Sequence, residues 1–221
     1  NYDKVAGVPN VEVIDGLAYF KDEHTVSIKT GSGVQEHYAE RIFINTGTTP
    51  FVPETEGLEI KGRIHTSETI MNLEEFPRSL AISGSGFIGL EFAASYAKFG
   101  TKVTIIDRGS KILPREDDDV ANAVFEAYKG LGIEFIFDAN IEKVEQDESE
   151  VKISYSSKGE AHELSAEAFL VATGRKANVE GLNLEAAGIE TSERGFINVN
   201  EHLQTNKPHI FAMGDINGGP Q

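Results

Sequence analysis

Hydrophobic and polar positions change their spacing along the chain, and the change predicts two kinds of structure. In the first fifty residues the apolar runs are short and are typical of β-strands with turns between them. Three such runs lie at 11–20, 24–30 and 37–47. The last becomes continuously apolar before Gly47, as a buried strand does. Prolines and a glycine then predict a loop over 48–60, and residues 67–77 predict a short helix that ends at Pro77.

After residue 77 the pattern becomes an alternation of buried strands with amphipathic helices. Strands are predicted at 79–83, 102–107, 133–138 and 168–172, and helices at 87–100 and 117–132. The segment between the third and fourth of these strands reads as a β-meander. Strands that alternate with helices of this length predict an α/β fold, a Rossmann-like parallel sheet with helices on both faces. The flanks of this unit are β-rich.

Composition and charge narrow the function classes. The chain has 221 residues, 39% of them hydrophobic, and a formal net charge of −16. An acidic surface of this kind repels phosphate backbones and anionic lipid, so no nucleic acid or membrane partner is expected. There are no cysteines, and the six histidines show no ligand spacing, so no metal site is predicted. With no signal or membrane segment in the pattern, a cytoplasmic location is expected.

One glycine motif carries specific chemistry. The stretch "AISGSGFIGLEFAA" contains Gly84, Gly86 and Gly89 in the spacing Gly-x-Gly-x-x-Gly, between a predicted strand and a predicted helix. The next strand ends in Asp107, 18 residues after the last glycine. This context is typical of a dinucleotide site: the loop and helix N-terminus take the pyrophosphate, and the acid accepts hydrogen bonds from a ribose. A glycine-rich turn that binds nothing is the weaker alternative.

Asp107 and Arg108 bear on the choice of dinucleotide in opposite ways. An acid at the end of this strand repels a 2′-phosphate and favours NAD(H), whereas a neighbouring arginine can accommodate that phosphate and favour NADP(H). Because the acid stands where the ribose is expected, we predict that NAD(H) is preferred over NADP(H). Arg108 then reads as a solvated surface residue.

Four further motifs occur along the whole chain in a familiar order. They are "DGLAYF" (15–20), "NTGTTP" (45–50), "VATGRKAN" (171–178) and "TNKPHIFAMGD" (205–215). Together with the glycine motif and the Glu91 that follows it, they resemble the pyridine nucleotide–disulfide oxidoreductase family, with a leaning toward its mercuric-reductase and reactive-chlorine-response branches. In that family, hydride passes from NAD(P)H to FAD and then to a disulfide or another acceptor.

The resemblance implies roles on the nicotinamide side. Phe87, in the glycine motif with Ile88, would cover the nicotinamide side of the flavin, with core packing as the alternative. Glu91 matches the family glutamate that pairs with a lysine near the flavin, which would make it a catalytic residue close to the flavin; a carboxylate on the helix surface is the alternative, because that lysine is not found in this chain. Val144 would contact the NAD adenine unless it is a core residue. Gly174, with Ala172 and Thr173, would form the turn past the nicotinamide.

The resemblance also implies residues for FAD. Ala18, next to Leu17, would contact the adenine, and Thr46 and Gly47 would belong to the first crossing between domains. Gly214 and Asp215 would hold the ribitol. Asn45 and Ala177 replace the family's usual alanine and proline in these motifs.

The family's FAD glycine motif, redox cysteine pair and C-terminal interface domain are not found in this sequence, which begins with Asn, so we expect a central fragment. The expected parts are two FAD-domain segments, 1–77 and 174–221, around an NAD(P)-binding domain over 78–173. The fragment is expected to bind NADH but to lack full activity, and the full-length parent is expected to be a homodimer. An NADH oxidase or ferredoxin-reductase-like flavoenzyme without a redox disulfide, or a non-catalytic NADH sensor, stays open as an alternative.

Overall fold

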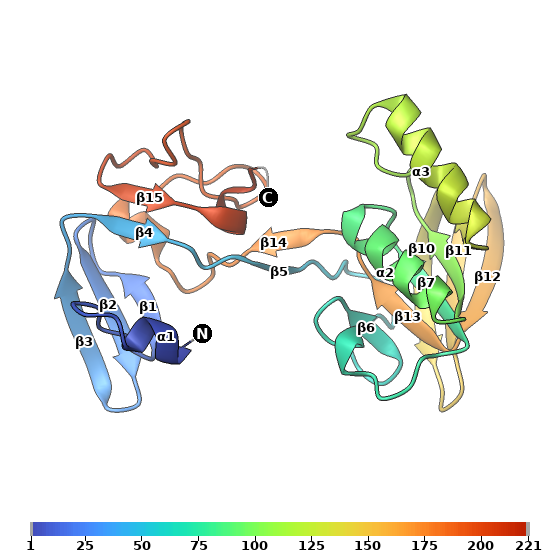
Figure 1. Ribbon diagram of the computed structural model, residues 1–221, viewed down its shortest axis with the longest axis horizontal. Coiled ribbons are helices and arrows are strands. Elements are labelled where there is room, and N and C mark those ends of the chain that lie inside the picture. The colour runs from blue at the N-terminus through green and yellow to red at the C-terminus, as the bar shows by residue number, and fades with distance from the viewer. Residues whose placement is uncertain (1, 220–221) are drawn as a thin grey trace. The chain divides into compact units, whose positions relative to one another are not determined.

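The computed structural model describes residues 2–219 and divides into two compact units. The central unit runs from Pro50 to Arg175 without interruption. The flanking unit combines the residues up to Thr49 with those from Lys176 onward. In Figure 1 the central unit carries the cyan to orange colours, and the flanking unit carries the blue and red ends of the scale.

A five-stranded parallel sheet forms the centre of the central unit. Its strands, in spatial order, are β6 (Ile64–Thr66), β13 (Ala168–Val171), β7 (Ser79–Ser83), β8 (Lys102–Ile106) and β9 (Glu134–Ile136). Helix α2 (Phe87–Lys98) connects β7 to β8, and α3 (Asp118–Gly130) connects β8 to β9. The four residues of β13 are all buried, as are the last four of β7 and of β8. Strands covered on both faces require the continuous apolar runs seen in the sequence.

The two faces of this sheet are covered by different structures. Leu80 and Ile82 of β7 pack with residues of α2 and α3 in one apolar cluster. Ala81, which points to the other face, packs in a second cluster with Val144 and Ile153. Those two residues belong to an antiparallel sheet of β10 (Ala139–Gln146), β11 (Val151–Ser157) and β12 (Glu160–Ala166).

The expectation of helices on both faces is therefore wrong. The chain steps from β7 to β8 to β9 in one direction across the sheet, and parallel crossovers are right-handed. Both crossover helices consequently lie on the same face, and the meander seen in the sequence supplies the cover for the other. The parallel sheet and the α/β fold themselves are confirmed.

The flanking unit contains an antiparallel sheet and a parallel strand pair. The sheet consists of β1 (Leu17–Phe20), β2 (Thr25–Thr30) and β3 (Gly33–Tyr38). The pair consists of β4 (Ile42–Ile44) and β15 (Ile210–Ala212). Short helices complete the unit: α1 (Tyr2–Ala6) and the 3₁₀ helices η2 (Leu184–Ala187) and η3 (Gly214–Asn217). Its apolar core draws on both parts of the chain, including Phe20, Ile44 and Ile210.

The chain passes between the units in two short strands, β5 (Thr48–Pro50) and β14 (Arg175–Ala177), which pair with each other. The compact central unit therefore begins at Pro50 rather than at the expected 78. The reason is that β6 joins the parallel sheet beside β13, and Ile70 is fully buried in the main apolar cluster.

Several expected elements differ in extent from those observed. The run at 11–20 is a strand only from Leu17 onward. The run at 37–47 is divided, because β3 ends at Tyr38 beside β2 whereas β4 begins at Ile42 with a new partner, β15. The helix expected at 67–77 is a single 3₁₀ turn, η1 (Ile70–Asn72). The loop expected at 48–60 contains β5.

Candidate functional site

The glycine motif lies at the carboxyl edge of the parallel sheet, where β7 ends and α2 begins. Gly84 N–H donates to the carbonyl of Ile106 at the end of β8 (3.0 Å), and Ala172 N–H, just after β13, donates to Ser83 O (2.8 Å). The ends of three neighbouring strands are thus tied together at the loop. The carboxyl edge of such a sheet is where ligands bind in open α/β folds.

Two of the three glycines are required by the fold. Gly84 has a φ of +106°, and a Cβ built there would lie 2.4 Å from Ala172 O. Gly89 lies inside α2, and a Cβ there would lie 2.1 Å from Gly84 O. Any side chain at these positions would displace backbone, so the close contact of helix and strand depends on them.

Gly86 is different, because nothing in the fold demands a glycine there. Its φ and ψ are −78° and −177°, an extended conformation that any residue adopts. A Cβ built on it would have no heavy atom within 4 Å. Gly86 is the N-cap residue of α2 and offers no side chain to the first N–H groups of the helix. The loop therefore leaves open space in front of unpaired backbone donors and the positive end of a helix dipole.

The carboxylate of Asp107 is bonded to the loop itself. Its Oδ2 accepts hydrogen bonds from the Ser85 N–H (2.6 Å) and the Ser85 hydroxyl (2.7 Å), and its Oδ1 accepts one from Gly109 N–H (2.7 Å). Asp107 is partly buried at the end of β8, as the sequence predicted, and Arg108 beside it is exposed. The link to Ser85 could not be read from the motif.

The other residues expected on the nicotinamide side fall into two groups. Phe87 is 63% exposed at the first turn of α2, which removes core packing as an explanation for it. Ile88 is partly buried and Glu91 is exposed on the same helix. Val144, by contrast, is 1% exposed and packs among apolar side chains of β10 and β11. It is a core residue, and the expected contact of its side chain with an adenine is not retained.

The turn after β13 lies directly beside the glycine motif. Gly174 has a φ of +141° and no heavy atom within 4 Å of a built Cβ, and its carbonyl accepts from Phe51 N–H at 2.9 Å. The Thr173 hydroxyl donates to Phe51 O at 3.0 Å. Arg175 follows, with its Nη2 3.9 Å from the carboxylate of Glu68. The turn is thus held in place against the start of the central unit.

In the flanking unit four of the expected FAD residues, Thr46, Gly47, Gly214 and Asp215, gather at the carboxyl ends of β4 and β15. The Thr48 hydroxyl donates to Asp215 Oδ2 at 3.1 Å. Thr46 and Asn178 are joined twice, by a bond from the Thr46 hydroxyl to Asn178 O and by one from the Asn178 amide to Thr46 O, each 2.9 Å. Gly214 has a φ of +73°, and a Cβ there would lie 2.8 Å from Asn45 Oδ1.

These contacts bring three motifs that are far apart in the sequence into one cluster. Gly47, with a φ of +69°, lies in the same segment and accepts a bond from Asn178 N–H at 3.0 Å. Ala18 and Leu17 are exposed on β1, outside the contacts of this cluster. Sequence reasoning missed the parts of Thr48 and Asn178, although both stand inside motifs that had been recognised.

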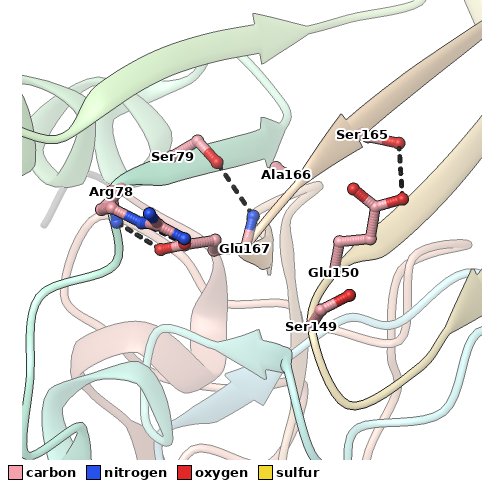
Figure 2. Close-up of a pocket in the computed structure, with 7 residues that line it drawn as sticks. All are labelled: Arg78, Ser79, Ser149, Glu150, Ser165, Ala166 and Glu167. Atoms are coloured by element: carbon pink, nitrogen blue, oxygen red, sulfur yellow. Dashed lines mark hydrogen bonds and ion pairs between the residues drawn. The ribbon is translucent and has the colours of Figure 1, made fainter.

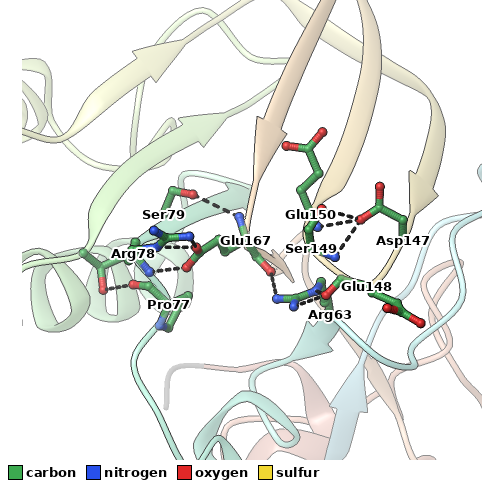
Figure 3. Close-up of polar contacts among 10 residues, drawn as sticks. Arg63, Pro77, Arg78, Ser79, Asp147, Glu148, Ser149, Glu150 and Glu167 are labelled. Atoms are coloured by element: carbon green, nitrogen blue, oxygen red, sulfur yellow. Dashed lines mark hydrogen bonds and ion pairs between the residues drawn. The ribbon is translucent and has the colours of Figure 1, made fainter.

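A cavity in the central unit lies at the other edge of the sheet. It has a volume of about 420 Å³ and is lined by Arg78, Ser79, Ser149, Glu150, Ser165, Ala166 and Glu167 (Figure 2). Ser79 begins β7, whereas the glycine motif follows its end. Hydrogen bonds from Arg78 hold the pKa of Glu167 below its ordinary value. Arg63 donates to the carbonyls of Glu167 and Glu148 in the same network (Figure 3). The cavity wall is thus held together by one ion pair, Arg78 with Glu167, and by hydrogen bonds that join strands.

Two negative findings apply to the described part of the chain. Within residues 2–219, no three His, Asp or Glu side chains converge in a way that would hold a metal ion. Over the same residues, no helix combines the length and the apolar character needed to cross a bilayer.

Comparison with known proteins agrees with the motifs and the fold. Residues 1–221 match the family described as pyridine nucleotide-disulphide oxidoreductase. The chain is 38% identical over 221 residues to the probable pyridine nucleotide-disulfide oxidoreductase RclA of Escherichia coli K12, an alignment that covers 100% of this chain and 49% of that protein. It is 37% identical over 210 residues to dihydrolipoyl dehydrogenase of Geobacillus stearothermophilus, covering 95% of this chain and 44% of that protein.

A mercuric reductase of Staphylococcus aureus is 35% identical over 210 residues, covering 95% of this chain and 38% of that protein. Among solved structures, the Cu(II) complex of the HOCl-induced flavoprotein disulfide reductase RclA from Escherichia coli matches with a TM-score of 0.90 and 38% identity, over 100% of this chain and 49% of that chain. The chain thus spans about half the length of these relatives or less. It belongs to the pyridine nucleotide-disulphide oxidoreductase family.

Proposed function

We propose that the central unit binds NAD(P)H and that the flanking unit carries part of the FAD site of a flavin-dependent oxidoreductase. Bound NAD(P)H supplies a hydride, which in the full-length enzyme passes through FAD to a disulfide or another acceptor. The residues described above supply binding, orientation and electrostatics, which is the share of the work that proteins perform in cofactor enzymes. Because the chain spans only part of its relatives, the activity of the whole enzyme and its assembly as a homodimer are part of the proposal.

One observation carries the assignment to NAD(P)H. Gly86 has an ordinary backbone conformation and open space around it, so folding alone does not explain why a glycine stands there. A pyrophosphate that approaches the backbone does explain it, because any side chain at Gly86 would occupy the place of the phosphate oxygens. The first N–H groups of α2 would then donate to an anion, and the helix dipole would favour it.

For the adenosine half we propose that Asp107 favours NADH over NADPH. Its carboxylate lies at the end of β8, beside the loop, and its negative charge opposes a 2′-phosphate. Arg108, the next residue, is exposed. We expect the preference to be moderate, since an arginine next to the acid offsets part of the repulsion.

For FAD, the cluster at the ends of β4 and β15 supports a role for Asp215. Its carboxylate is held by Thr48, and the neighbouring Gly214 permits a close approach of backbone. We propose that Thr46, Gly47, Gly214 and Asp215 contact FAD in the full-length enzyme. The only Gly-x-Gly-x-x-Gly motif in this sequence is that of the central unit, so we predict that this chain alone does not retain FAD.

Isothermal calorimetry of the purified chain with NADH and with NADPH tests the proposal. We expect both to bind at one site, NADH more tightly. An absence of binding for both at millimolar concentration would overturn the assignment of the central unit. The visible absorption spectrum of the same preparation tests the second part, because a flavin spectrum that survives gel filtration would contradict the prediction that FAD is not retained.

A further inference from the structure

We propose that Ser85 and Asp107 form a clamp that holds the glycine loop in its binding conformation, and that this positioning task is separable from the discrimination between NADH and NADPH. The inference rests on the proposed function of the central unit. Ser85 is the residue between Gly84 and Gly86, and its identity is not part of the glycine motif. The residue is only 2% exposed, so it does not itself face a ligand.

The acidic half of the clamp is held in place by backbone hydrogen bonds. The backbone of Asp107 makes two hydrogen bonds. Its N–H donates to Ile136 O at the end of β9 (2.9 Å), and its carbonyl accepts from Ala139 N–H at the start of β10 (3.0 Å). The carboxylate therefore projects from a fixed backbone. Both Ser85 donors, the backbone N–H and the hydroxyl, converge on one of its oxygens at 2.6 and 2.7 Å.

The other contacts of the loop reinforce the same conformation. The carbonyl of Ser85 accepts from Leu113 N–H at 3.3 Å, so all polar groups of this residue are engaged. The second carboxylate oxygen of Asp107 holds Gly109 N–H at 2.7 Å. One side chain thus ties the glycine loop to the loop that follows β8. Hydrogen bonds to an ionised acceptor are the strong kind, and this one is partly shielded from solvent.

The bonding of Asp107 limits what it can offer a ribose. A carboxylate has roughly four acceptor positions, and three of these are filled by Ser85 and Gly109. A ribose diol has two hydroxyls to donate, and it would have to share the remaining position or displace a loop contact. The charge of Asp107 still acts on a 2′-phosphate through space. Positioning therefore depends on the hydrogen bonds to Ser85, and discrimination depends on the charge.

Two single variants separate these tasks. Ser85→Ala removes the hydroxyl bond and keeps the charge of Asp107, so it should weaken NADH and NADPH by the same factor. We expect a loss of roughly tenfold, the factor that corresponds to about 1.4 kcal/mol. Asp107→Asn keeps an oxygen for Ser85 and removes the charge, so it should shift the ratio of the two affinities toward NADPH. Ser95→Ala is the matched control, because its hydroxyl bonds only Glu91 O on the same helix.

A double-variant cycle tests whether Ser85 acts through Asp107. Adding Ser85→Ala to Asp107→Ala should cost no further affinity, since the partner of the hydroxyl is already gone. Affinities are measured from the change in NADH fluorescence and by calorimetry on the full chain. An unchanged NADH affinity in Ser85→Ala, a loss for NADH alone, or independent effects in the cycle would each overturn the proposal.

Hydrogen exchange provides a readout that needs no ligand. Backbone amides of residues 84–90 should exchange faster in Ser85→Ala than in the unchanged chain, while those of β13 should not change. If the unchanged chain bound neither dinucleotide, the proposed function would fail, and this measurement would still test the clamp. Equal exchange at residues 84–90 in the two proteins would refute it.

Discussion

Replacing Gly86 by alanine should separate binding from folding. The structure predicts a large loss of dinucleotide affinity and little change in the stability of the fold. The φ and ψ of Gly86 suit alanine, and its Cβ would meet no atom within 4 Å. At an N-cap, alanine is less favourable than glycine by roughly 1 kcal/mol. Against this, alanine lowers the entropy of the unfolded chain, which contributes about 0.4–1 kcal/mol of stability. The free energy of unfolding should therefore change little.

The effect on a bound dinucleotide should be much larger. A methyl group in the space where a pyrophosphate meets the backbone is a case of overpacking, which costs typically 1–3 kcal/mol. The expected loss of NADH affinity is therefore about 5- to 150-fold. Urea unfolding measures the stability term, and titration of NADH followed by fluorescence or calorimetry measures the binding term.

Gly130→Ala is the matched control, because this glycine also has open space and an ordinary φ but lies in the last turn of α3. It should leave NADH affinity unchanged and raise stability slightly. If Gly86→Ala bound NADH as tightly as the unchanged chain does, the argument from the open space in front of α2 would be wrong. A large drop in the urea midpoint of Gly86→Ala would show that the fold itself requires this glycine.

Three further predictions concern stability and pH. Leu170→Ala should lower the free energy of unfolding by about 2–5 kcal/mol, since Leu170 is fully buried in β13, whereas Leu131→Ala, at a residue 41% exposed, should have a much smaller effect in the same urea experiment. Arg63→Met should lower the free energy of unfolding by roughly 1–2 kcal/mol, because the guanidinium donates to the carbonyls of Glu148 and Glu167. A loss of stability that was seen only in thermal unfolding above neutral pH would contradict this. Hydrogen bonds from Ser149 and Glu150 lower the pKa of Asp147 to about 2. The contribution of Asp147 to the stability of the fold is therefore fully present above the ordinary pKa near 3.9 and is lost as the pH falls toward about 2. Carboxyl NMR titration should show this, with the pKa returning toward its ordinary value in Ser149→Ala.

The longer elements of the central unit were predictable because each carries its own pattern. Strand β7 was placed without error, and α2 begins at the residue expected for it. Short strands were not predictable in this way. β6 has three residues, too few for a period to appear, and it is a strand only because Ile64 to Thr66 pair with β13. The helix expected at 67–77 was wrong for a related reason. Ile70 is buried in the main apolar cluster, and the single 3₁₀ turn η1 is enough to place it there.

The site shows the same division between local and tertiary information. Gly84, Gly86 and Gly89 form a motif within six residues, so their positions followed from the sequence. The partner of Ser85 is a residue on the next strand, and no local pattern specifies that bond. Val144 was ambiguous because an apolar residue in a strand faces either a ligand or the core, and only the packing of β10 on the parallel sheet decides for the core.

The order of the units along the chain has a consequence for how the protein folds. The strands β4 and β15 that pair in the flanking unit are separated by the whole central unit, so their pairing requires a long loop to close. The folded central unit brings its own ends together, with Phe51 bonded to Gly174 at 2.9 Å. Once it has formed, the loop that remains to be closed is much shorter. The continuous unit should therefore fold first during synthesis, and the flanking unit should assemble only after residues 210–212 have left the ribosome.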